Sequence, residues 1–540
     1  MRITNRMMVN NSLSNLQINK KQMNKIETQM STQKKINKPS EDPIVAIRAL
    51  RLRSSLDQVT QYLDKNIKDA DSWLKSTQSS LDEANSVLVK LYDYCTQGST
   101  DSYSSSERNT LADSLNQLKN TFYDQGNVDY SGRYIFTGYN TDKTLTYQSD
   151  EDAEGVNYTI SQNFTRDDLS LKTIYTNAYS NDDVINLNVK TDASGNVVTP
   201  NVTTTYRLRT GYSEVKSAGF TINYGNTDIA VSEDGKTAKV TTYQLDANGD
   251  KVKDASGNPV VLATTDVTAD ADGKFSVTAS DGSTVVLGTT TDSNYNPDDN
   301  EIIFNASTGE ILLGQNTYKN IYESNEFSIT YSKDNFKKGD LNPIMYYDCV
   351  DNNTGIEYKK KDEDINYNIN FSQEIKINTE AKDAFNIYLG RDIDDLITSV
   401  QNAIDVENQI SKVKEMQKLD QYKDSASQKK LSQMLEGLEK QKDLTKDNMT
   451  KTFEKGISKM QGYQSEVSIA KADVGNRLTR LDLNKTRLTE QKTNFKSLKS
   501  ENEDIDLEDV TINYLSAQLV YNAALSAAGK TVQQTLLDFL

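Results

Sequence analysis

The sequence predicts a mainly α protein with a β insertion. We expect an elongated antiparallel helical bundle or coiled coil built from both termini, with an antiparallel β region at its tip. Three observations predict this class. Apolar residues recur every three to four positions up to about residue 140, which indicates amphipathic helices. From about 141 to 390 the period changes to two, and from about 391 to 540 the helical spacing returns.

The first helical region begins after Pro43 and carries a long apolar stripe. The stripe consists of Leu56, Val59, Leu63, Ile67, Ala70, Leu74, Thr77, Leu81, Ala84, Leu88 and Leu91. Steps that alternate between three and four are typical of a packed helical rod. A shorter helix through Leu111 and Phe122 is predicted next, with a start near Ser106 and Glu107 after a loop over 96–106.

The middle of the chain has the pattern of short strands. TVVLG, EILLG and FSITY are rich in β-branched and aromatic residues. DASGN occurs at 192–196 and again at 254–258, and DANGD occurs at 246–250. Such segments are typical of hairpin turns made by Asp, Asn and Gly. An antiparallel β region is therefore expected, either as one domain or as two subdomains divided near 200–210 or near 300.

The last part of the chain is predicted to be helical again. Val474, Leu481, Leu488 and Phe495 recur every seven residues. A final stripe consists of Val510, Tyr514, Ala517, Tyr521, Ala524, Ala528, Val532, Leu536 and Phe539. Its alanines would let another backbone approach closely, so this face is expected to have a helical partner.

The two ends of the chain have opposite charges. Residues 1–35 carry seven basic residues against Glu27, and residues 501–540 carry seven acidic residues against Lys530. Val9, Leu16, Met23 and Met30 also recur every seven residues, with Leu13 and Ile26 between them. We expect the two ends to pair, with each other or with neighbouring subunits, as helices that order on assembly. A second interpretation of the acidic run ENEDIDLED is a helix start that suits the helix dipole.

Two of the six prolines of the chain lie close together in INKPSEDPIVAIRAL, at positions 39 and 43. Pro39 disfavours helix at Lys38, so the N-terminal helix is expected to stop there. Asp42 is a candidate cap for the next helix, and Pro43 suits the first turn of that helix. This corner would separate the terminal segment from the helical rod.

Composition argues against several classes of protein. The net charge of -17 opposes binding to phosphate backbones, which argues against a nucleic acid partner. No apolar stretch approaches the roughly 18 residues of a membrane span. The N-terminus has no apolar region of the kind found in secretory signal peptides. With 35% apolar residues, elongated or repeated helices are favoured over a large compact core.

The usual catalytic and metal-binding residue types are scarce. The chain has no histidine, which removes the commonest general base and metal ligand. Cys95 and Cys349 match no metal spacing, and either a disulfide or two idle thiols is compatible with them. DANGDKVKDASG fails the EF-hand pattern because Lys251 and Gly257 stand where Gly and Glu are needed. A looser calcium site, built from several turns of the β region, is an alternative that the sequence leaves open. We predict no catalytic, cofactor-binding or metal-binding residues and no enzymatic activity.

The terminal sequences resemble those of the flagellin superfamily. MRITNRMMVNNSLSNLQ, NKPSEDP and YSGRYIFTGYNT are similar to its N-terminal region, and ADVGNRLTRLDLN with LEDVTINYLSAQLVYNAALSAAGKTVQQTLLDFL to its C-terminal region. Within the superfamily the likeness is to the branch of hook–filament junction proteins. Members usually have a glycine where this chain has Gln33, so the corner is expected to be more helical before Asn37 than in relatives.

The resemblance implies a structural axial protein of the bacterial flagellum, located outside the cell and exported by the flagellar type III apparatus. Implied partners are further copies of the chain in a ring, the first hook-associated protein, flagellin and an export chaperone. The implied parts are an export and polymerisation segment with its corner (1–42), helical rods (43–140 and 391–500), a variable β-rich domain (141–390) and a polymerisation helix (501–540). Flagellin is the near alternative, which copy number would discriminate. A coiled-coil surface adhesin, which would need a signal peptide or an anchor, is the distant one.

Overall fold

The computed structural model describes residues 5–537 apart from 101–102, 247–250, 279–283 and 325, and it describes no side chains at 5 or 531–537. The predicted class is confirmed, since long helices occur on both sides of a region of mostly antiparallel sheets. The chain divides into two compact units. Unit 1 comprises Met1–Ser72, Asn366–Lys376 and Arg477–Leu540, and unit 2 comprises Trp73–Ile365 and Ile377–Asn476.

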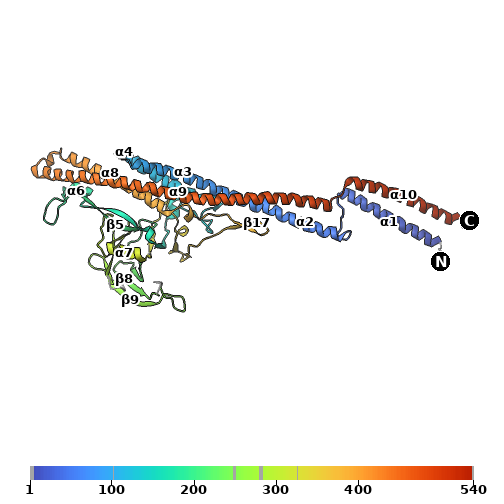
Figure 1. Cartoon of the computed structure of the whole chain (residues 1–540), viewed down its shortest axis with the longest axis horizontal. Helices are drawn as coiled ribbons and strands as arrows, with labels where there is room; N and C mark the ends of the chain where they lie inside the picture. The colour runs from blue at the N-terminus through green and yellow to red at the C-terminus, as the bar shows by residue number, and fades with distance from the viewer. Residues whose placement is uncertain (1–4, 101–102, 247–250, 279–283, 325, 538–540) are drawn as a thin grey trace. The chain divides into compact units, whose positions relative to one another are not determined.

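Helices make up most of both ends of the chain (Figure 1). The α-helices are α1 (Asn5–Thr32), α2 (Pro43–Gln61), α3 (Lys68–Gly98), α4 (Ser105–Asp124), α5 (Asp150–Ala153), α6 (Asn181–Asn186), α7 (Gln315–Ser324), α8 (Ile387–Met416), α9 (Ser425–Glu503) and α10 (Leu507–Leu537). Short 3₁₀ turns occur at η2 (Gln125–Asn127), η3 (Arg166–Asp168), η4 (Pro343–Met345), η5 (Ala381–Asp383) and η6 (Asp420–Tyr422).

The long apolar stripe after Pro43 is buried along most of its length, as predicted. Its fully buried members are Val59, Ile67, Ala70, Leu74, Thr77, Leu81, Ala84, Leu88 and Leu91. One π-helical turn, η1 (Tyr62–Ile67), interrupts the predicted rod between α2 and α3. In unit 1 the hairpin of β17 (Asn366–Asn370) and β18 (Gln373–Lys376) packs on this turn, and the rings of Tyr62 and Phe371 meet edge to face at 5.5 Å.

The second predicted helix begins slightly earlier than expected. Ser104, rather than Ser106, is the N-cap of α4, and it forms a capping box with Glu107. The Glu107 carboxylate accepts a hydrogen bond from the Ser104 backbone N–H at 2.7 Å. Because α3 continues to Gly98, the connection is also shorter than the predicted loop over 96–106.

The β region of unit 2 contains one sheet of six strands, one of eight and a small hairpin. The six-stranded sheet has the order β10-β11-β12-β13-β5-β4, from β10 (Phe275–Thr278), β11 (Thr284–Thr290), β12 (Glu301–Asn305), β13 (Glu310–Leu313), β5 (Asn201–Arg209) and β4 (Ser170–Thr176). The eight-stranded sheet has the order β16-β15-β3-β14-β6-β7-β8-β9, from β16 (Glu357–Tyr358), β15 (Asp348–Asp351), β3 (Tyr158–Phe164), β14 (Phe327–Lys333), β6 (Thr221–Tyr224), β7 (Thr227–Val231), β8 (Thr237–Tyr243) and β9 (Val261–Thr268). The hairpin pairs β1 (Asp129–Tyr130) with β2 (Arg133–Tyr134).

The strands of the two large sheets alternate along the chain. A division of the chain near 200–210 or near 300 therefore does not separate the two sheets into subdomains.

One pairing departs from the expected antiparallel pattern. Strands β11 and β12 are parallel, with Leu287 opposite Ile302. The connection over 291–300 could span up to about 33 Å when extended, which is enough to return the chain along the length of a strand. A parallel pair requires such a return, whereas a tight hairpin turn allows only an antiparallel pair.

The two DASGN segments form the predicted turns. In each copy the aspartate accepts two backbone N–H groups, from Ser194 and Asn196 at 2.9 Å and from Ser256 and Asn258 at 2.8 and 2.9 Å. The glycine of each copy has a positive φ, +81° at Gly195 and +86° at Gly257. Residues 247–250 of the DANGD segment lie outside the described residues.

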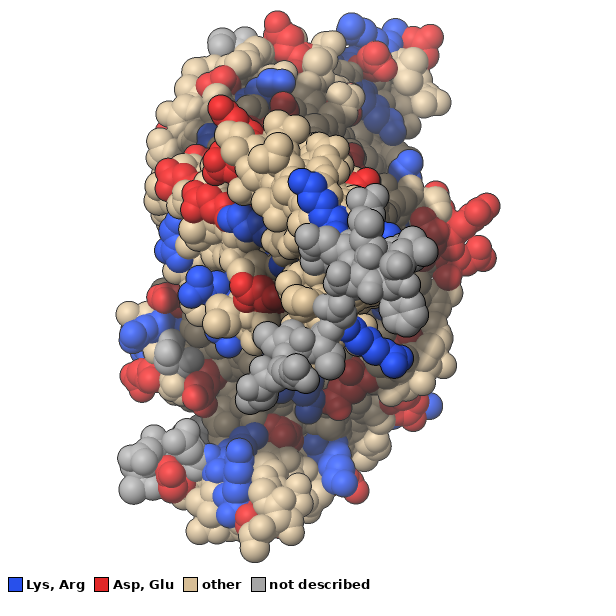
Figure 2. Space-filling view, turned by 90° about the vertical axis from the view of Figure 1, so that its right-hand side faces the viewer, with Lys and Arg blue, Asp and Glu red and all other residues tan. Residues whose placement is uncertain are grey.

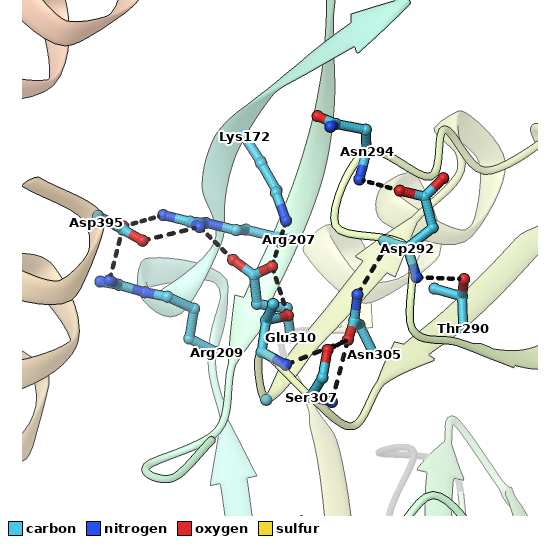
Figure 3. A network of polar contacts seen from close by, with 12 residues as sticks. Lys172, Arg207, Arg209, Thr290, Asp292, Asn294, Asn305, Ser307, Glu310 and Asp395 are labelled. Carbon is cyan, nitrogen blue, oxygen red and sulfur yellow. Dashed lines mark hydrogen bonds and ion pairs between the residues drawn. The ribbon is translucent and has the colours of Figure 1, made fainter. Parts of the chain in front are cut away.

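A buried ionic network fixes the six-stranded sheet to α8 (Figure 3). Arg207 of β5 bonds to Glu310 of β13 and to Asp395 of α8, and Lys172 of β4 also pairs with Glu310. Arg209 donates to Asp395 at 3.1 Å and pairs with Asp392. Each carboxylate of this network therefore has a cationic partner, as buried charges require.

Candidate assembly surface at the two ends of the chain

The N-terminal helix α1 turns its predicted stripe toward α10, and the two helices lie side by side in unit 1 (Figure 1). Val9, Leu16, Met23 and Met30 are all half-buried, and Ile26 between them is buried. Leu13, which was expected on the same stripe, is exposed instead. Between Val9 and Leu16, the residue on the half-buried face is Ser12 instead.

The predicted stripe of α10 is the face that α1 covers. Its described members, Val510, Tyr514, Ala517, Tyr521, Ala524 and Ala528, are half-buried, whereas most of their neighbours are exposed. Small side chains at every second turn let the two backbones approach closely. The side chains of Val532 and Leu536, and the whole of Phe539, lie outside the described residues.

The predicted position of the end of the N-terminal helix, Lys38, is wrong by six residues. Helix α1 ends at Thr32 rather than Lys38, and Gln33 follows with a left-handed φ of +56°. Lys35 then donates its backbone N–H to the Glu503 carbonyl at 2.8 Å, and Ile505 donates to the Gln33 carbonyl at 3.2 Å. The helix stops early because the chain leaves it to pair with the junction between α9 and α10. Residues 33–36, directly before Asn37, are not helical.

The proline corner occupies the non-helical residues between α1 and α2. Pro39 lies in a turn that is closed by the hydrogen bond from the Glu41 N–H to the Lys38 carbonyl at 3.0 Å. Asp42 is the N-cap of α2 and accepts from the N–H groups of Ile44 and Val45 at 3.0 and 3.1 Å. Pro43 is the first residue of α2, where its missing N–H leaves no hydrogen bond unmade.

A cluster of charges ties the corner to the end of α9. Glu503 is only 4% exposed, and its carboxylate accepts from Nε and Nη2 of Arg53, both at 2.7 Å. Lys34 lies 3.6 Å from the same carboxylate and pairs with Asp504. The hydrogen bond from Arg53 lowers the pKa of Glu503, and that from Lys34 lowers the pKa of Asp504. We call Lys34, Arg53, Glu503 and Asp504 the corner clasp.

The acidic run at 501–509 has two roles in the structure. Glu503 and Asp504 belong to the corner clasp, whereas Glu508 and Asp509 lie in the first turn of α10. There they face the positive end of the helix dipole. The pairing and helix-start interpretations of ENEDIDLED therefore apply to different residues.

Replacing Glu503 by Gln is expected to loosen the corner clasp. The loss of charge should lower the free energy of local opening by about 1 kcal/mol, because both cations are partly exposed and can be solvated. Hydrogen exchange at the amides of α10 measures this change. Glu501→Gln removes the same charge from an exposed neighbour and should leave exchange unaltered. Because the pKa of Glu503 is lowered, its contribution is present above about pH 4.3 and should fade as pH falls below that. Equal effects of both substitutions would contradict a role for the clasp.

Replacing Gln33 by Gly is expected to stabilise the end of α1. A side chain at a φ of +56° is strained, and glycine at this position of a helix end relieves that strain. The gain should be about 0.5–1 kcal/mol in the free energy of unfolding of unit 1, measured by thermal circular dichroism. Asn37→Gly, at an exposed residue with no positive φ, is the matched control and should destabilise. A loss of stability in Gln33→Gly would show that the side chain makes a contact worth more than the strain.

The metal-ligating and thiol side chains that the structure describes form neither a metal site nor a disulfide. Within the described ranges, no group of three or more Cys, Asp or Glu side chains could hold a metal ion, and no helix is long and apolar enough to cross a membrane. Cys95 and Cys349 are both buried free thiols rather than a disulfide. Burial raises the pKa of each thiol to about 12, so neither is a reactive thiolate at neutral pH.

The N-terminal part of the chain is similar to a known protein family. The model of the bacterial flagellin N-terminal helical region matches residues 3–141. Flagellar hook-associated protein 3 of Salmonella typhimurium is 30% identical over 149 residues, which cover 26% of this chain and 45% of that protein. A flagellin of Clostridium tyrobutyricum is 25% identical over 116 residues, which cover 22% of this chain and 30% of that protein. The chain thus matches less than half the length of these relatives. The crystal structure of Xanthomonas campestris FlgL aligns with 84% of this chain and 99% of its own, at 12% identity and a TM-score of 0.29.

Proposed function

We propose that this chain is a structural axial component of the bacterial flagellum, because residues 3–141 match the model of the bacterial flagellin N-terminal helical region. As a junction protein, it would join the hook, through the first hook-associated protein, to the flagellin filament. The observation that carries the proposal is the packing of α1 on α10, which unites both ends of the chain in unit 1. The outer face of α10 stays bare, and further copies would cover it.

The proposal assigns roles to the parts of the chain. Residues 1–42 and 501–540 are the assembly segments, and they order fully only when copies of the chain meet. The helical parts at 43–140 and 391–500 support them, and the β-rich part at 141–390 is free to vary. The chain would be exported by the flagellar type III apparatus without a cleaved signal peptide, with the help of a chaperone. No catalytic activity is part of the proposal.

Flagellin itself is the second candidate function. The match to a flagellin supports it, since the shared N-terminal region is common to both kinds of protein. The MRIT start and the KPSEDP corner favour the junction protein. A surface adhesin with a helical stalk is a distant third.

Deletion of the gene tests the proposal. A strain without the junction protein should be non-motile and should release flagellin monomers into the medium, and the full chain supplied from a plasmid should restore filaments. Loss of the major filament protein from the culture would instead identify the chain as flagellin. Normal filaments in the deletion strain would contradict both functions. Quantitative immunoblots of purified flagella give the copy number, which should be small for a junction protein.

A further inference from the structure

The outer face of α2 is apolar and basic. Ile44, Ile47 and Leu50 are between 52% and 65% exposed, while Ala46 and Ala49 on the opposite face are buried. Arg48 and Arg51 lie between these apolar residues and are exposed as well. Neither arginine forms an ion pair with any residue that the structure describes. We call Ile44, Ile47, Arg48, Leu50 and Arg51 the α2 ridge.

A second bare surface lies on α10, opposite the stripe that meets α1. Ile512, Leu515 and Leu519 are between 57% and 74% exposed. Glu508 lies on the same face one turn earlier, is exposed, and has no ion-pair partner among the described side chains. We call Glu508, Ile512, Leu515 and Leu519 the α10 ridge. Monomeric proteins seldom leave apolar rows of this kind uncovered.

The two ridges match in spacing and in charge. On the α10 ridge, Glu508, Ile512 and Leu515 are separated by four and then three residues. On the α2 ridge, Arg51, Ile47 and Ile44 are separated by the same steps when read in the opposite direction. Side chains at these steps share one face of a helix. An antiparallel contact would therefore set Glu508 against Arg51, Ile512 against Ile47 and Leu515 against Ile44.

We propose that the α10 ridge of one copy binds the α2 ridge of the next copy in this antiparallel register. The proposal rests on the assembly function given above and names the surfaces that carry it out. A contact between two α2 ridges would oppose arginine to arginine, and a contact between two α10 ridges would oppose acid to acid. The contact is therefore between unlike surfaces, and such a contact propagates into rings or helical arrays.

The occupant is a second copy because the chain holds its own α10 elsewhere. The backbone pairing of Gln33 and Lys35 with the junction between α9 and α10, together with the corner clasp, keeps α10 alongside α1. Both ridges are exposed in this arrangement, so they do not contact each other within one chain. Charge on the face shown in Figure 2 is mixed, with no broad area of one sign. In the proposed contact, the register is therefore set by the charges on the two ridges.

A contact of this size is too small to act alone. Stable interfaces bury about 1,200–2,000 Å² in total, whereas three apolar side chains on each helix bury less. We therefore expect the contact to form in flagella, where many copies are held together, and not between free monomers in dilute solution. The test must be made on assembled flagella.

A pair of cysteines tests the register directly. The variant Ile47→Cys with Ile512→Cys is expected to give disulfide-linked dimers and ladders of the chain when isolated flagella are oxidised, because a disulfide needs Cα atoms within about 7 Å. Ile47→Cys with Asn513→Cys, which moves one thiol off the α10 ridge, is the matched control and should give none. The native thiols will not interfere, because both are buried. Oxidised flagella of the wild-type chain measure any background formation of linked dimers.

Charge reversal tests the same contact without cysteines. Arg51→Glu should lower the amount of the chain in flagella by at least about fivefold, and adding Glu508→Arg to the same chain should restore it. Lys38→Glu, an exposed charge off the ridge, is the control and should have no effect. A double variant that is not rescued would overturn the register.

The outcomes separate this inference from the assembly function itself. If the cysteine variant is present in flagella and gives no linked dimers, the ridge contact is wrong and the assembly function stands. A disulfide within one monomer would show that α10 folds back on α2, which also overturns the contact between copies. If the wild-type chain is absent from purified flagella, the assembly function fails.

Discussion

Replacing Glu310 by Ala is expected to lower the free energy of unfolding of unit 2 by about 3–5 kcal/mol, the cost of breaking a buried ion pair on one side. Glu310 is 4% exposed, and its carboxylate forms ion pairs with Lys172 and Arg207 (Figure 3). It also accepts a hydrogen bond from the Thr308 hydroxyl. Without it, Lys172 loses its buried partner, and Arg207 keeps Asp395 as an ionic partner and the Ser170 hydroxyl as a hydrogen-bond acceptor. Urea unfolding followed by fluorescence measures the change, because the single tryptophan, Trp73, is buried in unit 2.

Two controls show whether the charge or the shape of Glu310 matters. The double substitution Lys172→Met with Glu310→Leu removes both charges and should cost less than Glu310→Ala alone, since no cation loses its only partner. Lys451→Ala breaks an exposed pair with Asp447 and should change stability by less than about 1 kcal/mol. If Glu310→Ala proved as mild as Lys451→Ala, the network would not anchor the sheet.

The pH dependence of unit 2 follows from the same network. Burial alone would raise the pKa of Glu310, but the charges of Arg207 and Lys172 outweigh it and leave the pKa below its ordinary value. A carboxylate with a lowered pKa stabilises the fold above its unfolded pKa of about 4.3, and this contribution fades as pH falls through the folded value. Wild-type unit 2 should therefore lose stability below about pH 4, and Glu310→Ala should lose less over the same range.

The helices were predictable because their signal is periodic. A stripe such as Leu74, Leu81 and Leu88 repeats one rule over many turns, so a single misplaced residue does not hide it. The stripe of α1 was found in the same way, although Leu13 was wrongly included, because a heptad pattern admits neighbouring positions. The turns at 192–196 and 254–258 were predictable because their Asp and Gly positions have one structural explanation.

The corner and the ionic network depend on residues far apart in the sequence. Gln33 adopts a left-handed φ because residues 33–35 pair with residues 503–505. No local sequence pattern near Gln33 predicts a partner 470 residues away. The acidic run at 501–509 was the one signal, and it predicted pairing with the basic end but not which residues meet. Arg207 and Arg209 alternate on a strand in the pattern of an exposed face, yet they are buried against α8.

The packing of Tyr179 against α9 is the basis of the second large prediction. Tyr179 belongs to a buried cluster in unit 2 with Val406, Ile410, Met434 and others from α8 and α9. The side-chain amide of Gln441 accepts from the Tyr179 backbone N–H at 2.8 Å and donates to its carbonyl at 3.3 Å. These two bonds hold the residue so that its ring lies directly over Gly437.

Replacing Gly437 by Ala is expected to destabilise unit 2 although alanine is the better helix former. A Cβ at this position would lie 2.5 Å from the Tyr179 ring. The ring is buried in the cluster and its backbone is held by Gln441, so it can move aside only by disturbing its neighbours. Overpacking of this kind costs about 1–3 kcal/mol, and over most of that range the cost exceeds the helix-propensity gain of about 1 kcal/mol. Gly462→Ala, in the same helix and with open space around its Cβ, should stabilise by about that gain. Urea unfolding monitored by Trp73 fluorescence should therefore shift in opposite directions for the two variants. Shifts of equal sign and size would mean that Gly437 is only a weak point of the helix and that Tyr179 docks without needing it.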